Sequence, residues 1–423
     1  MKPLRVGLCA LIVFGVMAHG GVEDWAVAVF EVVAGLLFVF WAMRSLFSAS
    51  EQLIISPLLL PLTAFALLVS GQYLFRATAS PYETRTDLLL LLADIIVFFL
   101  AAQAFRTLQD WRFFIWFVMI FGFFISAFGI LQHLAFNGKL YWFREMRYGG
   151  IPFGPYVNRN HFAGFAELVI PIALVPLVLG KVRRERWFVV GLFTVIPIAA
   201  LFLSASRGGI ISFGAELAAI GLWVVLRRAA GKQTLAAVAV LVVALLTVSL
   251  LGVREILQRF ASMQSLEATG AKRASMRHDT WRIFLDHPAI GTGLGTLQTV
   301  FPPYESLYDG KIVNHTHNDY LEALAETGTV GGLCCLWFLG VLFVESVRRL
   351  SRADQSFSAA LHLSGLVGCC GFLVHSSVDF NLHIPANALL FFLMAHLATS
   401  EIEELPVSSI PSRRRRRHRR KPG

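Results

Sequence analysis

Long apolar segments separated by short polar ones dominate this sequence of 423 residues. Most apolar segments reach about 17–25 residues, the length that an α-helix needs to cross a lipid bilayer. They lack the alternation of apolar and polar residues that a transmembrane β-barrel requires. Because lipid offers no hydrogen-bond partners to exposed backbone groups, we expect an all-α polytopic membrane protein.

The pattern predicts about twelve transmembrane helices. The first is short and follows "MKPLR", so a cleaved signal peptide is an alternative there. We favour an uncleaved membrane anchor because further spans follow at once. The predicted spans are residues 6–18, 25–43, 53–71, 88–105, 113–135, 161–179, 188–204, 210–226, 234–252, 319–345, 358–377 and 386–400.

Composition agrees with this fold class and excludes others. Hydrophobic residues make up 56% of the chain, charged residues 15%, and the mean hydropathy is +0.65. All five cysteines fall inside predicted spans, so we predict small buried thiols rather than disulfides or a zinc framework. The sequence contains no recognisable nucleotide-binding loop, which counts against a pump driven by ATP.

Positive charges predict the orientation of the spans. If both termini are cytoplasmic, the short inner loops, such as "GKVRRER" and "VRRLSRAD", are dense in Arg and Lys, as the positive-inside rule requires. The basic tail Arg413–Lys421 then anchors the chain near anionic lipid, and we do not expect a nucleic-acid partner. We therefore expect the chemistry of the protein on the outer face of the membrane.

An unusual number of arginines maps to this outer face. Arginine suits bidentate contacts to phosphate or carboxylate, so an external basic cavity predicts an anionic substrate. Contact with lipid phosphates at the interface is the alternative for part of the set. The residues are Arg76, Arg85, Arg144, Arg147, Arg159, Arg207, Arg254, Arg259, Arg273, Arg277 and Arg282.

The spacing of the spans divides the chain into five regions. Long loops in compact proteins tend to carry function, so the longest external connection is of most interest. The regions are N-terminal transmembrane helices (1–135), central transmembrane helices with the "SRGG" motif (136–252), a long external loop (253–318), C-terminal transmembrane helices (319–400) and a basic cytoplasmic tail (401–423).

The long external loop is predicted to contain two amphipathic helices that lie on the outer face of the bundle. In each, apolar residues recur at helical spacing. The first has Ile256, Leu257 and Phe260, and the second has Met276, Trp281, Phe284 and Leu285.

The segment "SASRGG" joins the outer end of one span to the start of the next. Ser206 can cap the incoming helix, with Arg207, Gly208 and Gly209 in its first turn. The free N–H groups and partial positive charge of a helix N-terminus bind anions, and Arg207 adds a full charge. The motif predicts a phosphate site, and a snorkelling arginine beside a helix-packing Gly-Gly pair is the alternative.

Two further basic segments border the external face. In "KRASMRHDTW", Arg277 and Trp281 are four residues apart on one helix face, so the cation could hold an anion while the indole stacks on a sugar or lipid. A solvated helix with an interfacial tryptophan is the alternative. In "NRNHFAG", Asn158 or Asn160 can cap the sixth span, which places Arg159 at the outer surface.

Several polar residues occupy positions where polarity is costly or unusual. Glu167, Glu322 and Glu326 fall inside predicted spans, where an unpaired charge is expensive, and are therefore site candidates. The last external turn contains Asp379, Asn381 and His383. For these three we expect a structural role in fixing the turn.

The segment "NHTHNDYLEALAETGTVGG" places two histidines at the mouth of the tenth span. Asn318 or Asp319 can cap that span, and Glu322 falls in its first turn, where the helix dipole favours negative charge. Capping leaves His317 unexplained, and a histidine can deprotonate a hydroxyl or stabilise a charged transition state. His315, His317 and Asp319 could instead ligate zinc, but their spacing is no strong metal signature, so we expect no metal.

Taken together, these motifs resemble the O-antigen ligase family, which includes related bacterial polysaccharide polymerases. The resemblance rests on "SRGG", "RxxxW…DHPxxGTGLGT", "HNDYLEALAETGTVGG", "NRNHFAGFAELVIP" and "DFNLHIPANA", which are spread in the family's order over residues 158–389. By motif, Arg207 and Arg277 match the family's pyrophosphate-binding arginines, and His317 matches its catalytic histidine. The candidate substrate-binding residues are Arg207, Arg277, Gly208, Gly209, His315, Asn318, Arg159 and Trp281.

The resemblance implies a membrane glycosyltransferase with a GT-C-like helical fold, working on the periplasmic side of the bacterial inner membrane. Its donor would be a glycan on undecaprenyl pyrophosphate, and its acceptor a hydroxyl of lipid A–core, of another lipid-linked glycan or of a protein. No cofactor or metal is implied, and one displacement would invert the anomeric centre. Ligase and polymerase remain alternatives within the family. A transporter of lipid-linked glycans and a metal-dependent intramembrane hydrolase are the alternatives from other classes.

Overall fold

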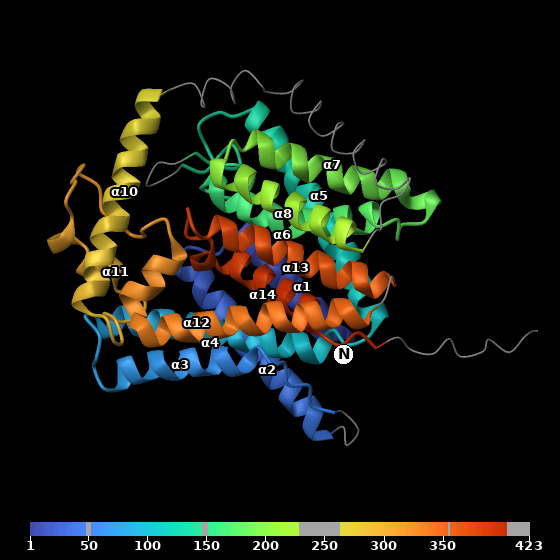
Figure 1. Cartoon of the computed structure of the whole chain (residues 1–423), viewed down its shortest axis with the longest axis horizontal. Coiled ribbons are helices and arrows are strands. Elements are labelled where there is room, and N and C mark those ends of the chain that lie inside the picture. Colours follow the sequence, from blue (N-terminus) through green and yellow to red (C-terminus); the bar gives the residue numbers. More distant parts are fainter. Residues whose placement is uncertain (48–51, 146–150, 228–262, 354–355, 404–423) are drawn as a thin grey trace, which may run out of the picture.

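The computed structural model describes residues 1–47, 52–145, 151–227, 263–353 and 356–403, and within these ranges the chain forms helices and no strands (Figure 1). The α-helices are α1 (Lys2–Met17), α2 (Asp24–Phe47), α3 (Leu59–Leu74), α4 (Pro81–Ala104), α5 (Leu108–Leu134), α6 (Arg159–Val178), α7 (Trp187–Leu203), α8 (Arg207–Leu226), α10 (Met263–Asp286), α11 (Leu297–Val300), α12 (Asp319–Arg352), α13 (Phe357–His375) and α14 (Pro385–Thr399). Three short 3-10 helices are η1 (Arg184–Arg186), η2 (Pro302–Tyr304) and η3 (Asn381–His383).

The described helices confirm an all-α polytopic membrane protein. Eight of them are long and apolar enough to cross a membrane, and α3 and α14 are shorter apolar helices. Each predicted span other than 234–252 coincides with a helix, and 234–252 lies outside the described residues, as does the predicted amphipathic helix around Ile256. The long helices run alongside one another, and α10 stands across one end of the bundle (Figure 1).

Helices α3 and α4 begin several residues away from their predicted starts, for local reasons. Helix α3 begins at Leu59 rather than at residue 53, because the preceding segment is held extended by Gln103, which hydrogen-bonds both the N–H (3.1 Å) and the carbonyl oxygen (2.6 Å) of Ile54. Helix α4 begins at Pro81, before the predicted residue 88. Proline suits the first helical position, and the Ser80 side chain caps the helix by accepting from the N–H of Glu83 (3.5 Å).

Helices α6, α13 and α14 form the centre of the bundle. Every residue of α6 from His161 to Val178 is buried, and α13 packs against α6, α8 and α14. On the peripheral helix α2, by contrast, large apolar side chains such as Leu36 and Leu46 are exposed. Exposed apolar side chains on a long helix are favourable where lipid rather than water surrounds them, so this distribution agrees with a membrane protein.

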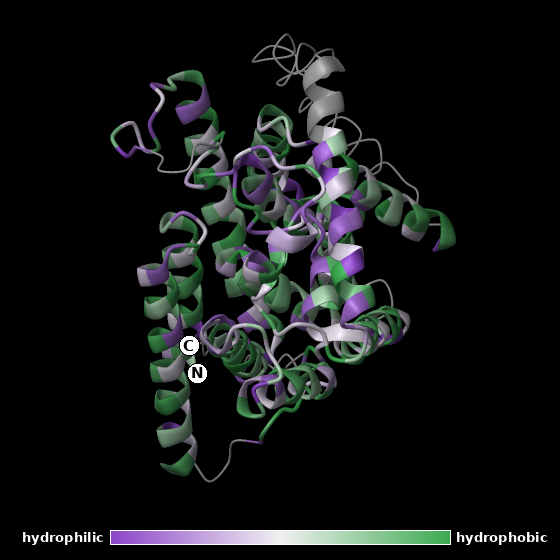
Figure 2. Cartoon of the chain, turned by 90° about the vertical axis from the view of Figure 1, so that its left-hand side faces the viewer, coloured by the Kyte–Doolittle hydropathy of each residue, from purple (hydrophilic) through white to green (hydrophobic). Residues whose placement is uncertain are grey.

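Hydrophilic residues gather at one end of the bundle. Figure 2 faces this end and shows them on α10 and the loops beside it, with hydrophobic helices around them. Helix α10 buries Met276 and Ile283 in a small apolar cluster with Leu297 and Phe301. The predicted apolar face of this helix was therefore partly wrong, because Trp281 is exposed and Ile283 takes the buried position.

Helix α12 is interrupted at Gly328, whose φ of 64° and ψ of −165° are not helical. The segment after α10 inserts at this break. The N–H groups of Thr292 and Gly293 donate to the carbonyl oxygens of Ala325 (3.1 Å) and Glu326 (2.9 Å), which the break leaves without helical partners. The glycine-rich segments "GTGLGT" (291–296) and "GTVGG" (328–332) thus lie at the contact between the external loop and the break in α12.

Replacing Gly328 with alanine should destabilise the protein by about 3 kcal/mol or more. Its backbone conformation is nearly restricted to glycine, and a Cβ there would lie 2.4 Å from the backbone of Ala289. Thermal unfolding of the full chain in detergent would measure the loss. The matched variant Gly340→Ala, on the same helix and with open space around its Cβ, should unfold at or above the wild-type temperature. Equal stability of the two variants would contradict the tight packing of Gly328 against the segment after α10.

Candidate active site

Segments that are far apart in the sequence meet at the turn between α13 and α14. Asn160, in the first turn of α6, donates a hydrogen bond to Asp379 of this turn. His317, in the loop before α12, hydrogen-bonds the other oxygen of the same carboxylate, Oδ1, at 3.0 Å. Arg273 of α10 donates to the carbonyl oxygen of Val378 at 3.2 Å. The turn therefore joins the bundle centre, the external loop and α10 at one point.

His317 is fixed in backbone and in side chain. Its φ of 53° lies in the left-handed region, and the next residue, Asn318, caps α12 by accepting from the N–H of Leu321 (3.0 Å). The imidazole lies 5.1 Å from the ring of Phe380, centre to centre. Because the carboxylate of Asp379 accepts from Nδ1, the Nε2 atom of His317 is left to accept a proton. His317 therefore has the geometry of a general base.

Asp379 is a buried carboxylate with several donors. It accepts from His317, from Asn160 and from the backbone N–H that follows it (3.0 Å), and its side chain is 1% exposed. Burial by itself would raise the pKa of Asp379. The hydrogen bond and charge of His317, with the charges of His161 and His375, instead hold that pKa well below its usual range. Asp379 is therefore ionised at neutral pH.

Three arginines cluster beside this carboxylate. Burial lowers the pKa of the Arg273 guanidinium, the charge of Asp379 opposes that shift, and the charges of Arg207 and Arg277 lower the pKa further. These influences place Arg207, at the start of α8, and Arg277, on α10, near Arg273. Two of the three, Arg207 and Arg277, were predicted as anion-binding residues, and the structure brings both near Arg273.

The first turn of α8 has the predicted cap. The Ser206 side chain accepts from the N–H of Gly209 at 3.2 Å. Both glycines are required by packing, because a Cβ on Gly208 would lie 2.5 Å from Nε2 of His375, and one on Gly209 would lie 2.6 Å from the Cβ of Ala163. The glycines therefore let the N-terminus of α8 approach α6 and α13, and their role as ligand contacts remains a prediction.

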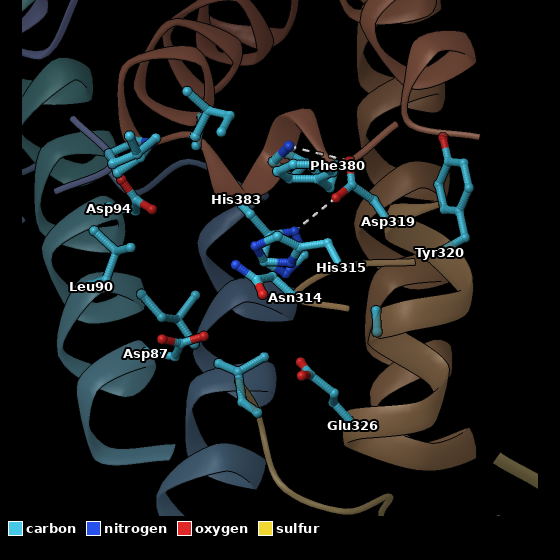
Figure 3. Close-up of a pocket in the computed structure, with 18 of the residues that line it drawn as sticks. Asp87, Leu90, Asp94, Asn314, His315, Asp319, Tyr320, Glu326, Phe380 and His383 are labelled. Carbon is cyan, nitrogen blue, oxygen red and sulfur yellow. Dashed lines mark hydrogen bonds and ion pairs between the residues drawn. The ribbon is translucent and has the colours of Figure 1, made fainter. Parts of the chain in front are cut away.

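A second histidine–carboxylate cluster lies beside the first. His383 hydrogen-bonds Asp319 through Nδ1 (2.9 Å), and its Nε2 lies 3.5 Å from Oε1 of Glu322. His315 binds the same Oε1 through Nδ1 at 2.7 Å and stacks on Phe380 with ring centres 4.3 Å apart. Figure 3 shows His315, Asp319, Phe380 and His383 together. His315, two residues before His317 in the same loop, thus pairs with a carboxylate in the first turn of α12.

The charge state of His383 follows from its surroundings. Burial by itself would lower its pKa, but the carboxylates of Glu322, Asp319 and Glu326 raise it to about 10. The imidazole is therefore protonated at neutral pH and balances the buried negative charges around it.

A cavity of about 1470 Å³ opens beside both clusters. Its polar part is lined by residues that include His317, Asp87 and Glu326, and Figure 3 shows the last two facing it from α4 and α12. Its apolar part is lined by residues of the bundle such as Phe338 and Phe391. A space that joins ionisable groups to apolar side chains suits a lipid with a polar head.

The other predicted site residues lie around these clusters. Arg159 is the first residue of α6 and is half-buried, next to Asn160. Trp281 is exposed on α10 and lines the cavity. Glu167 is fully buried two turns inside α6 and is paired with Nδ1 of His375 at 2.8 Å, as an intramembrane carboxylate requires.

Sequence reasoning undervalued three residues. Asp379 and His383 were predicted only to fix a turn, yet each pairs with an ionisable residue more than 60 positions away. Arg273 was one of many outer arginines. Only the motif "DFNLHIPANA" gave a signal, since an aspartate and a histidine near the mouth of a span are unusual. Their partners could not be read from it.

The fold and this site define a multi-pass, all-helical membrane protein with a basic, histidine-containing site at one end of its bundle. Residues 168–336 match the family model described as O-Antigen ligase. The match supports a relationship over this part of the chain to the O-antigen ligase/polymerase family, whose members are glycosyltransferase-like enzymes that act on lipid-linked glycans. A comparison with curated proteins found no match.

Exchange of Asp379 for asparagine should lower stability in a pH-dependent way. The depressed pKa of Asp379 means that its contribution is present above the ordinary value of about 3.9 and is lost as pH falls towards the folded-state value. Loss of the charged hydrogen bonds should cost about 2–3 kcal/mol at pH 7, and this deficit should shrink below about pH 4. Thermal unfolding in detergent across pH measures it.

The exposed Asp24 supplies the control for this variant. Asp24→Asn should match the wild type at every pH, because an exposed charge contributes little. A deficit of Asp379→Asn that stays constant from pH 7 to pH 3 would show that the carboxylate charge is not what stabilises the turn.

Proposed function

We propose that the protein is an inverting, metal-independent glycosyltransferase of the bacterial inner membrane. It transfers a glycan from undecaprenyl pyrophosphate to an acceptor hydroxyl, on lipid A–core or a similar glycan, at the periplasmic face. The observation that carries this proposal is the pairing of His317 with the buried Asp379 beside Arg207, Arg273 and Arg277. A fixed general base next to three cations suits attack by a hydroxyl with departure of a pyrophosphate.

The arginines would act on the leaving group. As the bond between the anomeric carbon and the pyrophosphate oxygen breaks, negative charge grows on the pyrophosphate. Arg207, Arg273 and Arg277 would stabilise that charge through hydrogen bonds to phosphate oxygens. The N–H groups at the start of α8 would add to this stabilisation, since a helix N-terminus favours anions.

His317 would act on the acceptor. Its Nε2 atom would take the proton of the acceptor hydroxyl while the hydroxyl oxygen forms a bond to the anomeric carbon. Asp379 would hold the ring in the tautomer that leaves Nε2 free, and its charge would stabilise the imidazolium that forms. A single displacement exchanges the bond to pyrophosphate for the bond to the acceptor and inverts the anomeric centre.

The cavity supports a lipid-linked substrate. Its apolar lining by Phe338 and Phe391 would hold the polyprenyl chain of the donor within the bundle. Its polar part adjoins His317, and Trp281, exposed on α10, offers an indole on which a sugar ring could stack. Arg159, His315 and Asn318 would border the glycan.

The location of the charges favours transfer over transport. A transporter of lipid-linked glycans needs charged groups along a path through the membrane. Here Arg273 and Arg277 lie on α10, Arg207 lies near Arg273, and His317 pairs with Asp379, whose charge also acts on Arg273. Helix α10 stands at one end of the bundle (Figure 1). The dense Arg and Lys of the opposite loops support the proposal that this end faces the periplasm and that both termini are cytoplasmic.

Alanine variants of His317, Arg207 and Arg277 test this proposal. Loss of the base should lower transfer about 10²–10⁴-fold, and loss of either arginine about 10²–10³-fold, while the protein still accumulates in the membrane. Transfer would be measured with purified full-length protein in lipid, a polyprenyl-pyrophosphate-linked glycan and a glycan acceptor.

Matched controls come from the exposed face of α10. Arg282 is exposed, with its guanidinium 5.8 Å from the ring centre of Tyr304, and His278 is 69% exposed. Arg282→Ala and His278→Ala should transfer at the wild-type rate. Full activity of His317→Ala would refute the mechanism.

Deletion in the native host distinguishes ligase from polymerase. In a ligase mutant, all repeats should be missing from the core and polymer should accumulate on the lipid carrier. In a polymerase mutant, the core should carry a single repeat and long chains should be absent. Electrophoresis of extracted glycans, with restoration by the wild-type chain and not by His317→Ala, gives the answer; an unchanged glycan profile would contradict both activities.

A further inference from the structure

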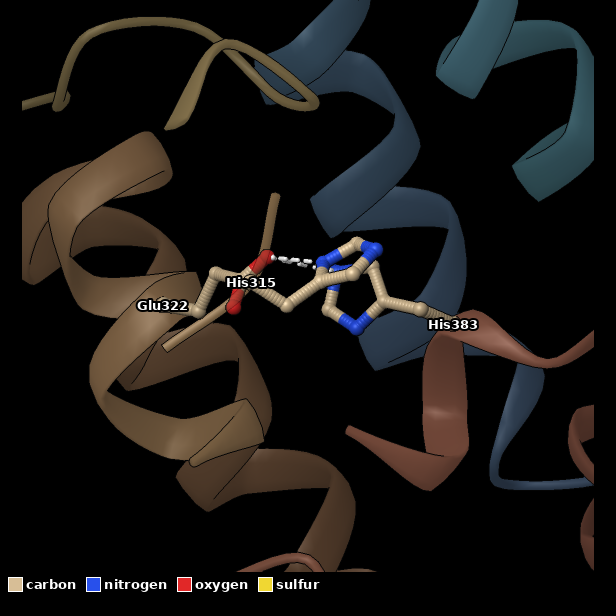
Figure 4. Close-up of side chains that lie close together, drawn as sticks. All are labelled: His315, Glu322 and His383. Atoms are coloured by element: carbon tan, nitrogen blue, oxygen red, sulfur yellow. Dashed lines mark hydrogen bonds and ion pairs between the residues drawn. The ribbon is translucent and has the colours of Figure 1, made fainter. Parts of the chain in front are cut away.

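His315, Glu322 and His383 offer three metal-ligand atoms within 4.8 Å of one another (Figure 4). They come from three separate segments, namely the loop before α12, the first turn of α12 and η3. The Oε1 atom of Glu322 lies 2.7 Å from Nδ1 of His315 and 3.5 Å from Nε2 of His383. Two imidazoles and one carboxylate are the donor set of many open zinc sites.

The second shell around these atoms is that of a metal site. His383 is held through its Nδ1 by Asp319 at 2.9 Å, which leaves Nε2 pointing at Glu322. Metal-binding histidines are usually oriented in this way by a carboxylate on the other ring nitrogen. The second oxygen of Glu322 accepts from the N–H (2.9 Å) and the hydroxyl (3.2 Å) of Thr316. Oε1 is therefore the oxygen that remains for a metal.

The separations of Glu322 from the two histidines fit a small ion, and all three ligand atoms lie within 4.8 Å of one another. Bonds of about 2.0–2.1 Å in tetrahedral geometry place two ligands about 3.3 Å apart. The separation of 3.5 Å between His383 and Glu322 meets this already. The 2.7 Å contact of His315 is a hydrogen bond that would open by about half an ångström as the ion replaced the proton.

We propose that His315, Glu322 and His383 bind one transition-metal ion of the Zn²⁺ class. His315 and His383 both line the cavity, which leaves a fourth position for water or a hydroxyl oxygen on that side. The ion clamps the loop that carries His317 to α12 and η3. Its binding does not depend on the proposed transfer reaction, and no step of that reaction passes through it.

Without an ion, the same side chains form a network of ion pairs. The charged groups that face this network are Asp319 on α12, Asp87 on α4, and Glu326, which lies one turn after Glu322 on α12. A metal and a proton compete for the imidazole nitrogens, so metal affinity should fall steeply as the pH is lowered from 8 to 6. A network that only pairs charges would bind no metal at either pH.

The test measures binding of Zn²⁺ and Co²⁺ to purified full-length protein, prepared in detergent with a histidine-free affinity tag and stripped with a chelator. We expect about one ion per chain by elemental analysis after dialysis, and intense visible absorption of the Co²⁺ form, which tetrahedral coordination gives. Zn²⁺ should also raise the unfolding temperature of the wild type. Weak, octahedral-type Co²⁺ absorption or no bound ion in the wild type overturns the proposal, whatever the variants do.

Variants then locate the ion. Glu322→Gln and His383→Ala should each weaken Zn²⁺ binding at least about 100-fold, and Asp319→Asn about 10–100-fold through the second shell. His278→Ala, at an exposed histidine, should bind as the wild type does. Wild-type affinity in both Glu322→Gln and His383→Ala would place the ion elsewhere and refute this site.

Discussion

Two reciprocal histidine–aspartate pairs connect the start of α12 to the turn before α14, and the site depends on them. His317 of the first segment binds Asp379 of the second, and His383 of the second binds Asp319 of the first. Phe380 lies between, 4.3 Å from the ring of His315 and 5.1 Å from that of His317. Because each segment gives one acid and one base, neither can shift along the other without breaking both charged hydrogen bonds.

These pairs can form because three helices of the bundle begin beside the turn before α14, where Asn160, Gly208 and Asn318 meet it. Helices α6, α8 and α12 are capped by Asn158, Ser206 and Asn318, and each presents its N-terminus to the turn. Asn160, in the first turn of α6, donates to Asp379, so the positive dipole end of α6 lies at this carboxylate and adds to the reasons why it is ionised. The same positive potential extends to the three arginines and would attract an anionic group there.

The sequence predicts what is local and not what is long-range. The lengths of the apolar segments predict the spans, and short motifs predict the caps at Ser206 and Asn318. Both signals lie within a few turns of one helix. The partner of His317 could not be found in this way, since Asp379 is 62 positions away and looks like a turn residue. The choice of Ile283 rather than Trp281 as the buried residue of α10 likewise depends on what α10 packs against.

The pairs His317–Asp379 and His383–Asp319 differ in the sign of the charges around them. Asp379 acts on Arg273, which lies near Arg207 and Arg277, so positive charge prevails on that side. On the other side, His383 lies between the carboxylates of Asp319 and Glu322. Negative charge therefore prevails there and favours a proton or a metal ion on the imidazole of His383. An anion is therefore favoured on the side of His317 and a cation on the side of His383.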